Sequence, residues 1–298
     1  MIDRSDRTYS NDGNKLHLNK LEIPLPDKLD AEKTFEIYEL LRPILPAPKL
    51  INSKKVRSVR EILDKVDGVI LDGYGIINIG DQPTPEIFSF FEEIRARSLP
   101  FVILTNGASY PSDISAKKYR RWGLNINVSD IISSRDVLEA HLLEKPEKNI
   151  MRLNASTTPL KNNIDMYKDA CSYKDALREA EAFAFMGSVG WTEAEQAELE
   201  AALIENPRPV FVANPDVSAP QKNGFSAEPG YWVTRALKKA DFQVEWYGKP
   251  HHASFQMAID ILQRNTDRPL RKSHIAMVGD SLHTDILGAT AAGLLSVL

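Results

Sequence analysis

The sequence predicts an α/β fold: a Rossmann-like parallel sheet covered by helices, with a second α/β domain inserted along the chain. Short apolar runs alternate with amphipathic helical stretches from residue 59 onward, which is typical of parallel strands joined by crossover helices. Three of these runs, at 68–71, 101–104 and 275–279, are each followed directly by small and polar residues. Functional side chains collect at the carboxyl ends of parallel strands, so the same pattern predicts where a site lies.

The segments between the apolar runs predict the remaining elements. Amphipathic helices are expected at 86–98 and 284–292, and the apolar residues 294–298 are expected to form a strand at the sheet edge. A helix is also expected at 31–41, because prolines at 43, 46 and 48 follow its apolar face. The middle of the chain has an alternation of its own, with a strand at 182–186, a helix at 192–204 and a strand at 209–213.

This alternation divides the chain into three parts. We assign residues 59–146 together with 243–298 to a core domain, 147–242 to an inserted cap domain, and 1–58 to a partly helical N-terminal extension.

Composition narrows the class of protein. The 298 residues are 43 % hydrophobic and 26 % charged, with a formal net charge of −4, which does not favour nucleic-acid binding. Basic residues such as Lys117 and Arg121 occur at helical spacing and are interpreted as a solvated helix face. The single cysteine, Cys171, excludes an intrachain disulfide, and no run reaches the ~18 apolar residues of a membrane span. We therefore expect a cytoplasmic protein without a membrane partner.

The first chemical motif follows the run at 68–71. Asp72 stands at the tip of this predicted strand, and Gly73, Tyr74 and Gly75 allow the backbone to turn tightly behind it. A carboxylate placed there can attack a substrate or bind a metal ion. Alone, however, it is better explained as a strand-end acid that forms a turn.

Two further motifs offer groups that suit an anion. Thr105 and Asn106 follow the second strand, where a hydroxyl and an amide stand beside the start of a helix. Lys249 follows an apolar run and can balance the charge of a carboxylate or a phosphate. An ordinary Asn-Gly turn and a surface lysine are the alternative readings.

The fourth motif offers two more acids. Asp280 and Asp285 lie five residues apart around a strand-to-helix turn, so both can approach one cation, and hard oxygen ligands favour Mg²⁺. Helix N-capping by Asp280 is the alternative.

The four motifs, taken together and in this order, resemble the signature of the haloacid dehalogenase (HAD) superfamily over residues 59–298. The resemblance implies the HAD fold and a phosphatase in which Asp72 attacks phosphorus to form an aspartyl-phosphate. It also implies that Mg²⁺ is held by Asp72, the carbonyl of Tyr74, Asp280 and Asp285. Thr105 and Asn106 would hold the phosphoryl oxygens. Lys249 would balance the remaining charge. A small phosphorylated metabolite is then the expected substrate partner, and a homodimer stays open.

The cap position refines the resemblance. Only 32 residues separate Asp72 from Thr105, whereas 143 separate Thr105 from Lys249, so the cap lies between the second and third motifs. Within it, Asn214 and Asp216, in the run Ala-Asn-Pro-Asp, resemble the cap signature of class IIA, the group of 4-nitrophenyl phosphatases and sugar phosphatases. These two residues are the candidate substrate contacts in the cap, and a plain turn is the alternative.

Tyr74 departs from the pattern. Phosphatases of the family place a second aspartate here, which protonates the leaving group and later activates water. A phenol can donate a proton at neutral pH but is a poor base, so turnover is expected to be slow. Two alternatives therefore stay open: a catalytically impaired protein that binds phosphate ligands, and a 2-haloacid dehalogenase, whose first motif also carries a tyrosine.

Overall fold

The computed structural model describes residues 22–47, 52–147, 149–154, 158, 160 and 173–298. Cys171 and most of the polar opening segment therefore lie outside the described residues. The chain divides into two compact units, which are described separately below. We call Pro46–Thr105, Pro111–Ser134 and Lys249–Leu298 the core unit, and Met1–Leu45, Asn106–Tyr110 and Arg135–Gly248 the cap unit.

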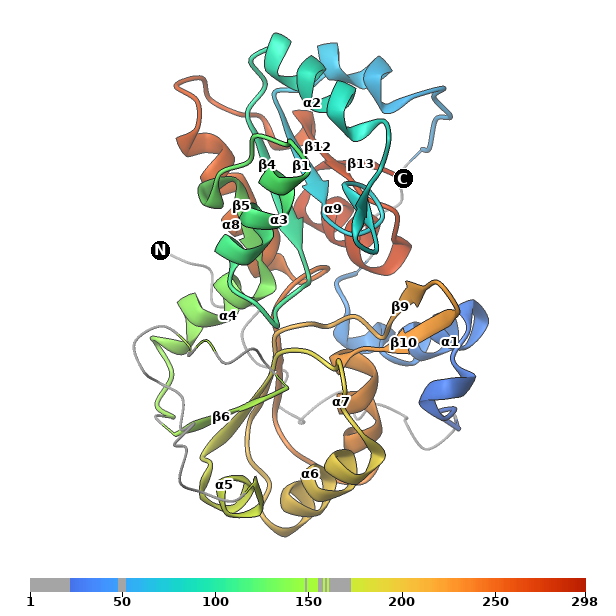
Figure 1. Ribbon diagram of the computed structural model, residues 1–298, viewed down its shortest axis with the longest axis vertical. Helices are drawn as coiled ribbons and strands as arrows, with labels where there is room; N and C mark the ends of the chain where they lie inside the picture. The colour runs from blue at the N-terminus through green and yellow to red at the C-terminus, as the bar shows by residue number, and fades with distance from the viewer. Residues whose placement is uncertain (1–21, 48–51, 148, 155–157, 159, 161–172) are drawn as a thin grey trace. The chain divides into compact units, whose positions relative to one another are not determined.

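The core unit is built on a five-stranded parallel sheet (Figure 1). The strand order is β13-β12-β1-β4-β5, so β1 lies at the centre with β12 and β4 as its neighbours. The bounds are β1 (Gly68–Asp72), β4 (Phe101–Thr105), β5 (Ile131–Ser133), β12 (Ile275–Val278) and β13 (Leu295–Val297). The three predicted strands and the predicted edge strand are thus confirmed, and a short fifth strand is added.

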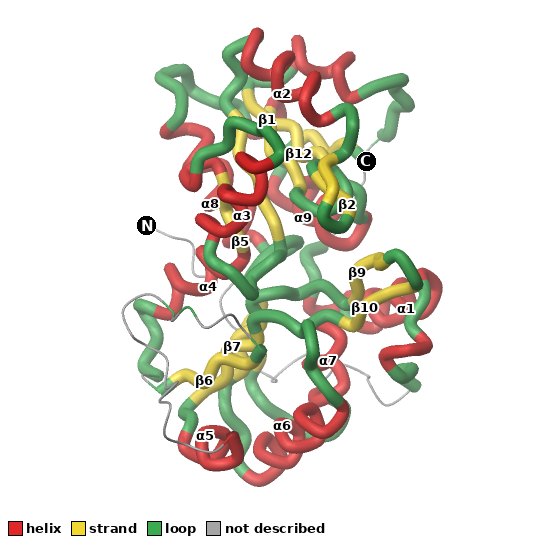
Figure 2. Tube along the Cα trace, in the orientation of Figure 1, coloured by secondary structure: helices red, strands yellow, loops and turns green. Residues whose placement is uncertain are grey.

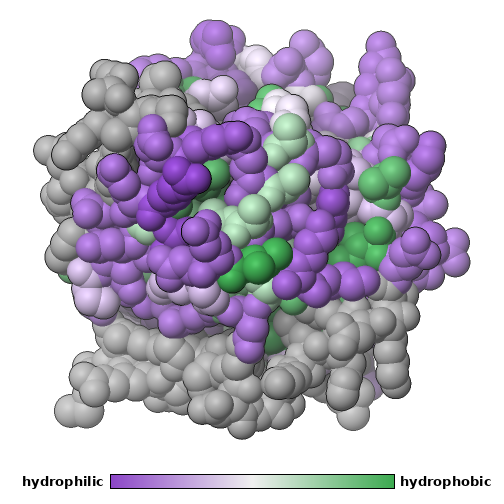
Figure 3. Space-filling model, turned by 90° about the horizontal axis from the view of Figure 1, so that it is seen from below, coloured by the Kyte–Doolittle hydropathy of each residue, from purple (hydrophilic) through white to green (hydrophobic). Residues whose placement is uncertain are grey.

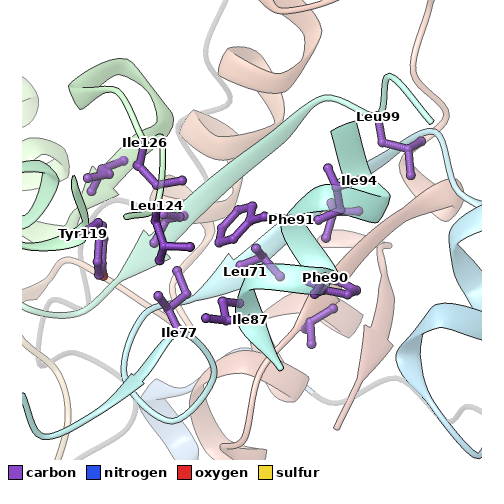
Figure 4. Packing of buried hydrophobic residues seen from close by; sticks show 14 of the residues in the cluster. Leu71, Ile77, Ile87, Phe90, Phe91, Ile94, Leu99, Tyr119, Leu124 and Ile126 are labelled. Atoms are coloured by element: carbon purple, nitrogen blue, oxygen red, sulfur yellow. The ribbon is translucent and has the colours of Figure 1, made fainter. Parts of the chain in front are cut away.

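Helices cover this sheet on both faces. The bounds are α2 (Ile87–Ala96), α3 (Ser112–Arg121), α8 (His252–Arg264) and α9 (Leu287–Ala292), with short helical turns η5 (Val59–Lys65), η6 (Val128–Asp130) and η8 (Lys272–His274). Val69 and Leu71 of β1 are buried in a cluster with the apolar side chains of α2 and α3 (Figure 4). Gly68, which precedes Val69 and so points to the other face of the sheet, faces Leu262 of α8 instead. Alternate residues of a strand point to opposite faces, so β1 is buried from both sides.

Two details of the core unit differ from the predicted alternation of strands and helices. A small hairpin of β2 (Asn78–Ile79) and β3 (Gln82–Pro83) follows β1 directly. The predicted helix at 284–292 begins earlier, with a π-helical turn η9 (Leu282–Ile286), because the amide groups of Asp285 and Ile286 both donate to the carbonyl of Ser281.

The cap unit contains a second parallel sheet. Its order is β11-β8-β7-β6, and its bounds are β6 (Ile150–Leu153), β7 (Ala182–Phe185), β8 (Val210–Val212) and β11 (Val244–Trp246). An antiparallel hairpin, β9 (Ser218–Gln221) and β10 (Gly224–Ala227), follows β8, and the helices are α4 (Ser134–Leu142), α5 (Tyr173–Glu179), α6 (Glu193–Glu205) and α7 (Pro229–Leu237). The prediction of an inserted α/β domain is confirmed, and α6 begins at a capping box formed by Thr192 and Glu195.

The described part of the N-terminal extension up to Leu45 belongs to the cap unit. It contains η3 (Pro26–Lys28), the predicted helix α1 (Ala31–Leu40) and η4 (Arg42–Ile44). Asp30 caps α1 by accepting a hydrogen bond from the amide of Lys33 at 2.7 Å. Ile37, Tyr38 and Leu41 are buried, so this segment forms part of the core of the cap unit.

The surface is typical of a globular protein. On the face shown in Figure 3, coloured residues are mostly hydrophilic, and hydrophobic ones occur in small groups among them. The secondary structure in Figure 2 consists of short elements joined by loops, and no helix among the described residues has the length and apolar character needed to span a bilayer.

Candidate active site

Asp72 is the last residue of the central strand of the core sheet. Its neighbours in the sheet are β12 and β4, with Leu71 paired to Val278 and Asp72 paired to Leu104. Its side chain is buried, at 7 % exposure, and its Oδ1 accepts a hydrogen bond from the amide of Gly73 at 2.7 Å. The parallel sheet thus delivers a buried carboxylate at its carboxyl edge, where loops from neighbouring strands also begin.

Lys249 lies directly against Asp72, although 176 residues stand between them in the sequence. Its Nζ is 2.5 Å from Oδ1 of Asp72 and 2.7 Å from Oδ1 of Asp285, and the lysine is only 2 % exposed. Burial alone disfavours the charged ammonium, but attraction from Asp285 and Asp72 outweighs burial and raises the pKa of Lys249. Lys249 is therefore held as a cation between two carboxylates.

Three carboxylates, including that of Asp72, lie close together at this edge of the sheet. Asp72, Asp280 and Asp285 each offer an oxygen within 4.8 Å of the others. Gly75 makes room for one of them, since a Cβ at this position would lie 2.0 Å from Oδ2 of Asp280, and its φ of +95° is also suited to glycine. Asp285 is fully buried, and its Oδ2 accepts a hydrogen bond from the amide of Ser281 at 3.1 Å.

The charges of this cluster do not balance without a further cation. Burial raises the pKa of Asp72; Lys249 opposes this shift in part, and Asp285 and Asp280 reinforce it. Burial, followed by the charge of Asp285, also raises the pKa of Asp280. Fully ionised, three carboxylates and one ammonium carry a net charge of −2, which matches a divalent cation. Oxygen ligands of this kind are those that Mg²⁺ prefers, so the residues fit that ion.

The hydroxyl of Thr105 lies beside the backbone that follows Asp72. A Cβ built at Gly73 would lie 3.3 Å from Oγ1 of Thr105 and 3.2 Å from the hydroxyl of Tyr119. Tyr119, on α3, is buried, and burial followed by the charge of Asp72 raises the pKa of its phenol. Tyr119 was not expected at the site, because the charged residues around it in the sequence identify α3 only as a solvated helix.

Asn106 follows Thr105 in the chain but belongs to the cap unit. It is 5 % exposed, and its Nδ2 donates to Oδ1 of Asp216 at 2.8 Å. The amide of Asp216 donates in turn to Oδ1 of Asn214 at 3.0 Å, which closes the turn after β8. The structure thus links three of the predicted site residues, Asn106, Asn214 and Asp216, within the cap unit.

Glu228 completes this network from the start of α7. Its Oε2 accepts hydrogen bonds from Asn214 Nδ2 at 3.3 Å and Ser188 Oγ at 3.2 Å, and its Oε1 accepts from Ser226 Oγ at 2.7 Å. Burial, with a smaller contribution from Asp216, raises the pKa of Glu228 to about 7. In the sequence Glu228 only precedes a proline, so no local pattern could have identified it.

The pKa of Glu228 gives a testable dependence of stability on pH. The fold retains the proton of Glu228 up to about pH 7, whereas an ordinary glutamate loses it near 4.5, so the free energy of unfolding falls as pH rises through this window. Denaturant unfolding of Glu228→Gln at pH 5 and pH 8 should show the variant gaining about 1–2 kcal/mol relative to wild type at the higher pH. Glu205→Gln, on the exposed end of α6, is the control for the loss of a glutamate charge. If the free energy of unfolding changes equally with pH in wild type and Glu228→Gln, the raised pKa of Glu228 is contradicted.

Tyr74, the residue that departs from the family pattern, lies in the turn between β1 and β2. It is half-buried and forms an isolated bridge with Asn78, while Gly75 donates its amide to the carbonyl of Asn78 at 2.8 Å. The hairpin therefore fixes the backbone of this turn immediately after Asp72.

Models of known families match two stretches of the chain, and each stretch includes part of the core unit. Residues 69–162 match a family described as haloacid dehalogenase-like hydrolase, and residues 246–298 match a second, HAD-hydrolase-like family. The chain belongs to the haloacid dehalogenase superfamily. The cap inserted between Thr105 and Lys249 is the arrangement of class IIA, and the predicted fold class is confirmed.

Relatives of this HAD protein carry the names of phosphatases. A dihydroxyacetone phosphatase of Corynebacterium glutamicum is 24 % identical over 241 residues, which cover 79 % of each chain. An acid sugar phosphatase of Staphylococcus epidermidis is 31 % identical over 100 residues, and this match spans only 36 % of that protein and 34 % of this chain.

Solved structures share the fold of this HAD protein. A Cytophaga hutchinsonii protein described as a possible sugar phosphatase has a TM-score of 0.70 at 24 % identity, covering 82 % of this chain and 88 % of its own. The p-nitrophenyl phosphatase of Archaeoglobus fulgidus has a TM-score of 0.62 at 20 % identity, covering 78 % and 85 %.

Proposed function

We propose that this HAD protein is a Mg²⁺-dependent phosphatase of small phosphomonoesters, with Asp72 as the nucleophile. The observation that carries this proposal is the buried cluster in which Lys249 contacts both Asp72 and Asp285, with Asp280 nearby. The names of the relatives, which are sugar and triose phosphatases, support a small phosphorylated metabolite as the substrate. We place the enzyme in the cytoplasm, acting without nucleic acid or membrane as a partner; a homodimer remains an open expectation.

The contacts of Asp72 assign different roles to its two oxygens. Lys249 Nζ and the Gly73 amide both donate to Oδ1, so we assign Oδ2 to the attack on phosphorus. The new bond joins Oδ2 to phosphorus while the bond from phosphorus to the ester oxygen breaks, and water later hydrolyses the aspartyl-phosphate. Lys249 reduces the repulsion between the attacking carboxylate and the dianionic phosphate, as a positive charge fixed in a dry site does effectively.

The other candidate residues supply binding. Asp72, Asp280 and Asp285, with the carbonyl of Tyr74, are the proposed ligands of Mg²⁺, which when bound neutralises charge on the phosphoryl oxygens. Thr105 and Asn106 are the proposed donors to those oxygens. Asn214 and Asp216 are the proposed substrate contacts in the cap, and Asp216 also orients Asn106 through the hydrogen bond to its amide.

Tyr74 is the proposed reason for slow turnover. Tyr74→Asp restores a carboxylic acid at this position, so we expect kcat for a phosphomonoester to rise by about 10-fold or more; a fully effective general acid–base typically contributes ~10²–10⁴-fold. Tyr74→Phe is the matched control, because it removes only the hydroxyl group. A fall in kcat with phenylalanine identifies the phenol as the proton donor. If Tyr74→Asp leaves kcat unchanged, the missing acid does not limit the reaction.

Tyr74 also favours one second candidate, a protein that binds phosphate ligands and turns them over poorly or not at all. A screen of phosphomonoesters, including 4-nitrophenyl phosphate and sugar phosphates, separates the candidates by phosphate release with and without Mg²⁺. Mg²⁺-dependent release supports the phosphatase, and binding without release supports the impaired protein. Metal-independent release of halide from a 2-haloacid would instead identify a dehalogenase and overturn the proposal.

A further inference from the structure

The N-terminal segment 22–45 lies before the matched family regions, which begin at residue 69, yet it packs within the cap unit. Hydrogen bonds between described residues join it to the rest of that unit. Tyr231 Oη donates to the carbonyl of Pro24 at 2.6 Å, and the hydroxyls of Thr34 and Ser218 lie 2.8 Å apart. The third bond runs from the amide of Val217 to Oη of Tyr38 at 3.2 Å. Figure 1 shows α1 beside the β9–β10 hairpin.

Tyr38 satisfies a backbone group that water does not reach. Val217 has no exposed surface and Tyr38 is 6 % exposed, so the amide of Val217 depends on the phenol oxygen for its hydrogen bond. The phenol is fixed in turn by its helix, because α1 is capped at Asp30 and buries Ile37 beside Tyr38. A rigid element therefore holds one end of the turn at 214–217.

The neighbouring residue of this turn holds Asn106. Asp216, directly before Val217, accepts the hydrogen bond from Asn106 Nδ2, and Asn214 is fixed by Glu228. A continuous path of contacts thus runs from Tyr38 through the turn to the side chain of Asn106, all within the cap unit.

We propose that the N-terminal segment sets the position of this turn, and that Tyr38 is a positioning residue for Asn106 and hence for phosphate binding. The inference rests on the proposed function only in taking Asn106 as a donor to the phosphoryl group. The turn must keep Oδ1 of Asp216 within hydrogen-bonding distance of Asn106, and displacement of the Val217 backbone would lengthen that bond or turn the amide away. A segment outside the family match would in this way tune the affinity of a site that the family shares.

Two matched variants test the proposal. Tyr38→Phe and Tyr231→Phe each remove one phenol oxygen that joins the segment to the cap unit, but only the first contacts the turn. The probe is inorganic phosphate in the presence of Mg²⁺, with Kd measured by isothermal titration calorimetry, alongside KM and kcat for 4-nitrophenyl phosphate and thermal unfolding of each variant.

We expect Tyr38→Phe to raise Kd and KM by about three- to tenfold, the effect of losing one hydrogen bond, with kcat changed less than about twofold. Tyr231→Phe should lower Tm without moving Kd or KM. Equal Kd values for wild type and Tyr38→Phe, or equal increases in both variants, would show that the segment only stabilises the fold.

The two readouts separate this inference from the proposed function. If wild type binds phosphate but releases none from the ester, hydrolysis is excluded and the Kd values still decide the role of Tyr38. If wild type does not bind phosphate, both proposals fall.

Discussion

Asp72→Asn is expected to lower the rate of phosphate release by about 10⁴-fold or more, the loss typical of removing a catalytic nucleophile. The amide of asparagine does not attack phosphorus to form the aspartyl-phosphate, so the covalent step is lost. The measurement is kcat for the best substrate of the screen at saturating Mg²⁺.

Asp67→Asn is the matched control for this variant. Asp67 stands just before the opposite end of β1 and forms a surface ion pair with Arg271 at 2.9 Å, so its loss should leave kcat near the wild-type value. Activity of Asp72→Asn within about tenfold of wild type would remove Asp72 from the role of nucleophile.

Of the proposed variants, Lys249→Met is expected to lower the free energy of unfolding most. The variant leaves Asp72 and Asp285 buried without their cation, and breaking a buried ion pair in this way costs about 3–5 kcal/mol of the free energy of unfolding. One of the carboxylates can take up a proton instead, so the loss should be smaller at pH 5 than at pH 8. Denaturant unfolding of the metal-free variant measures both effects.

Mg²⁺ should restore part of this stability, because a divalent cation replaces the missing charge and binds only the folded cluster. Lys117→Met is the control: its ion pair with Asp113 at 2.8 Å is exposed, so removing it should leave the free energy of unfolding close to the wild-type value and give no response to Mg²⁺. If Lys249→Met is as stable as Lys117→Met in the absence of metal, the cluster does not carry the charge described here.

The core sheet could be predicted because its strands are continuous apolar runs. β1, β4 and β12 are buried on both faces, so each is apolar over its length and ends abruptly at polar residues. β5 has only three residues, and the hairpins β2–β3 and β9–β10 are partly exposed, so their sequences lack that contrast. Packing in three dimensions, which local pattern does not encode, decides these elements.

The candidate site could be predicted for a related reason. Asp72 and Thr105 end β1 and β4, and Asp280 follows β12, so their proximity to one edge of the sheet follows from topology alone. Glu228 and Tyr38 are different, because each matters through partners distant in sequence, Ser188 for one and Val217 for the other. Nothing in a single sequence indicates that a tyrosine of an N-terminal helix will reach the amide of Val217.

Asp72 is expected to become phosphorylated during turnover. The most direct test is an acid quench of the enzyme during reaction with substrate and Mg²⁺, followed by peptide mass spectrometry. We expect one added phosphoryl group on the peptide that contains Asp72, present in the wild type and absent from Asp72→Asn. A phosphoryl group on another residue, or full turnover with no phosphoryl group on Asp72 in quenched samples, would contradict it.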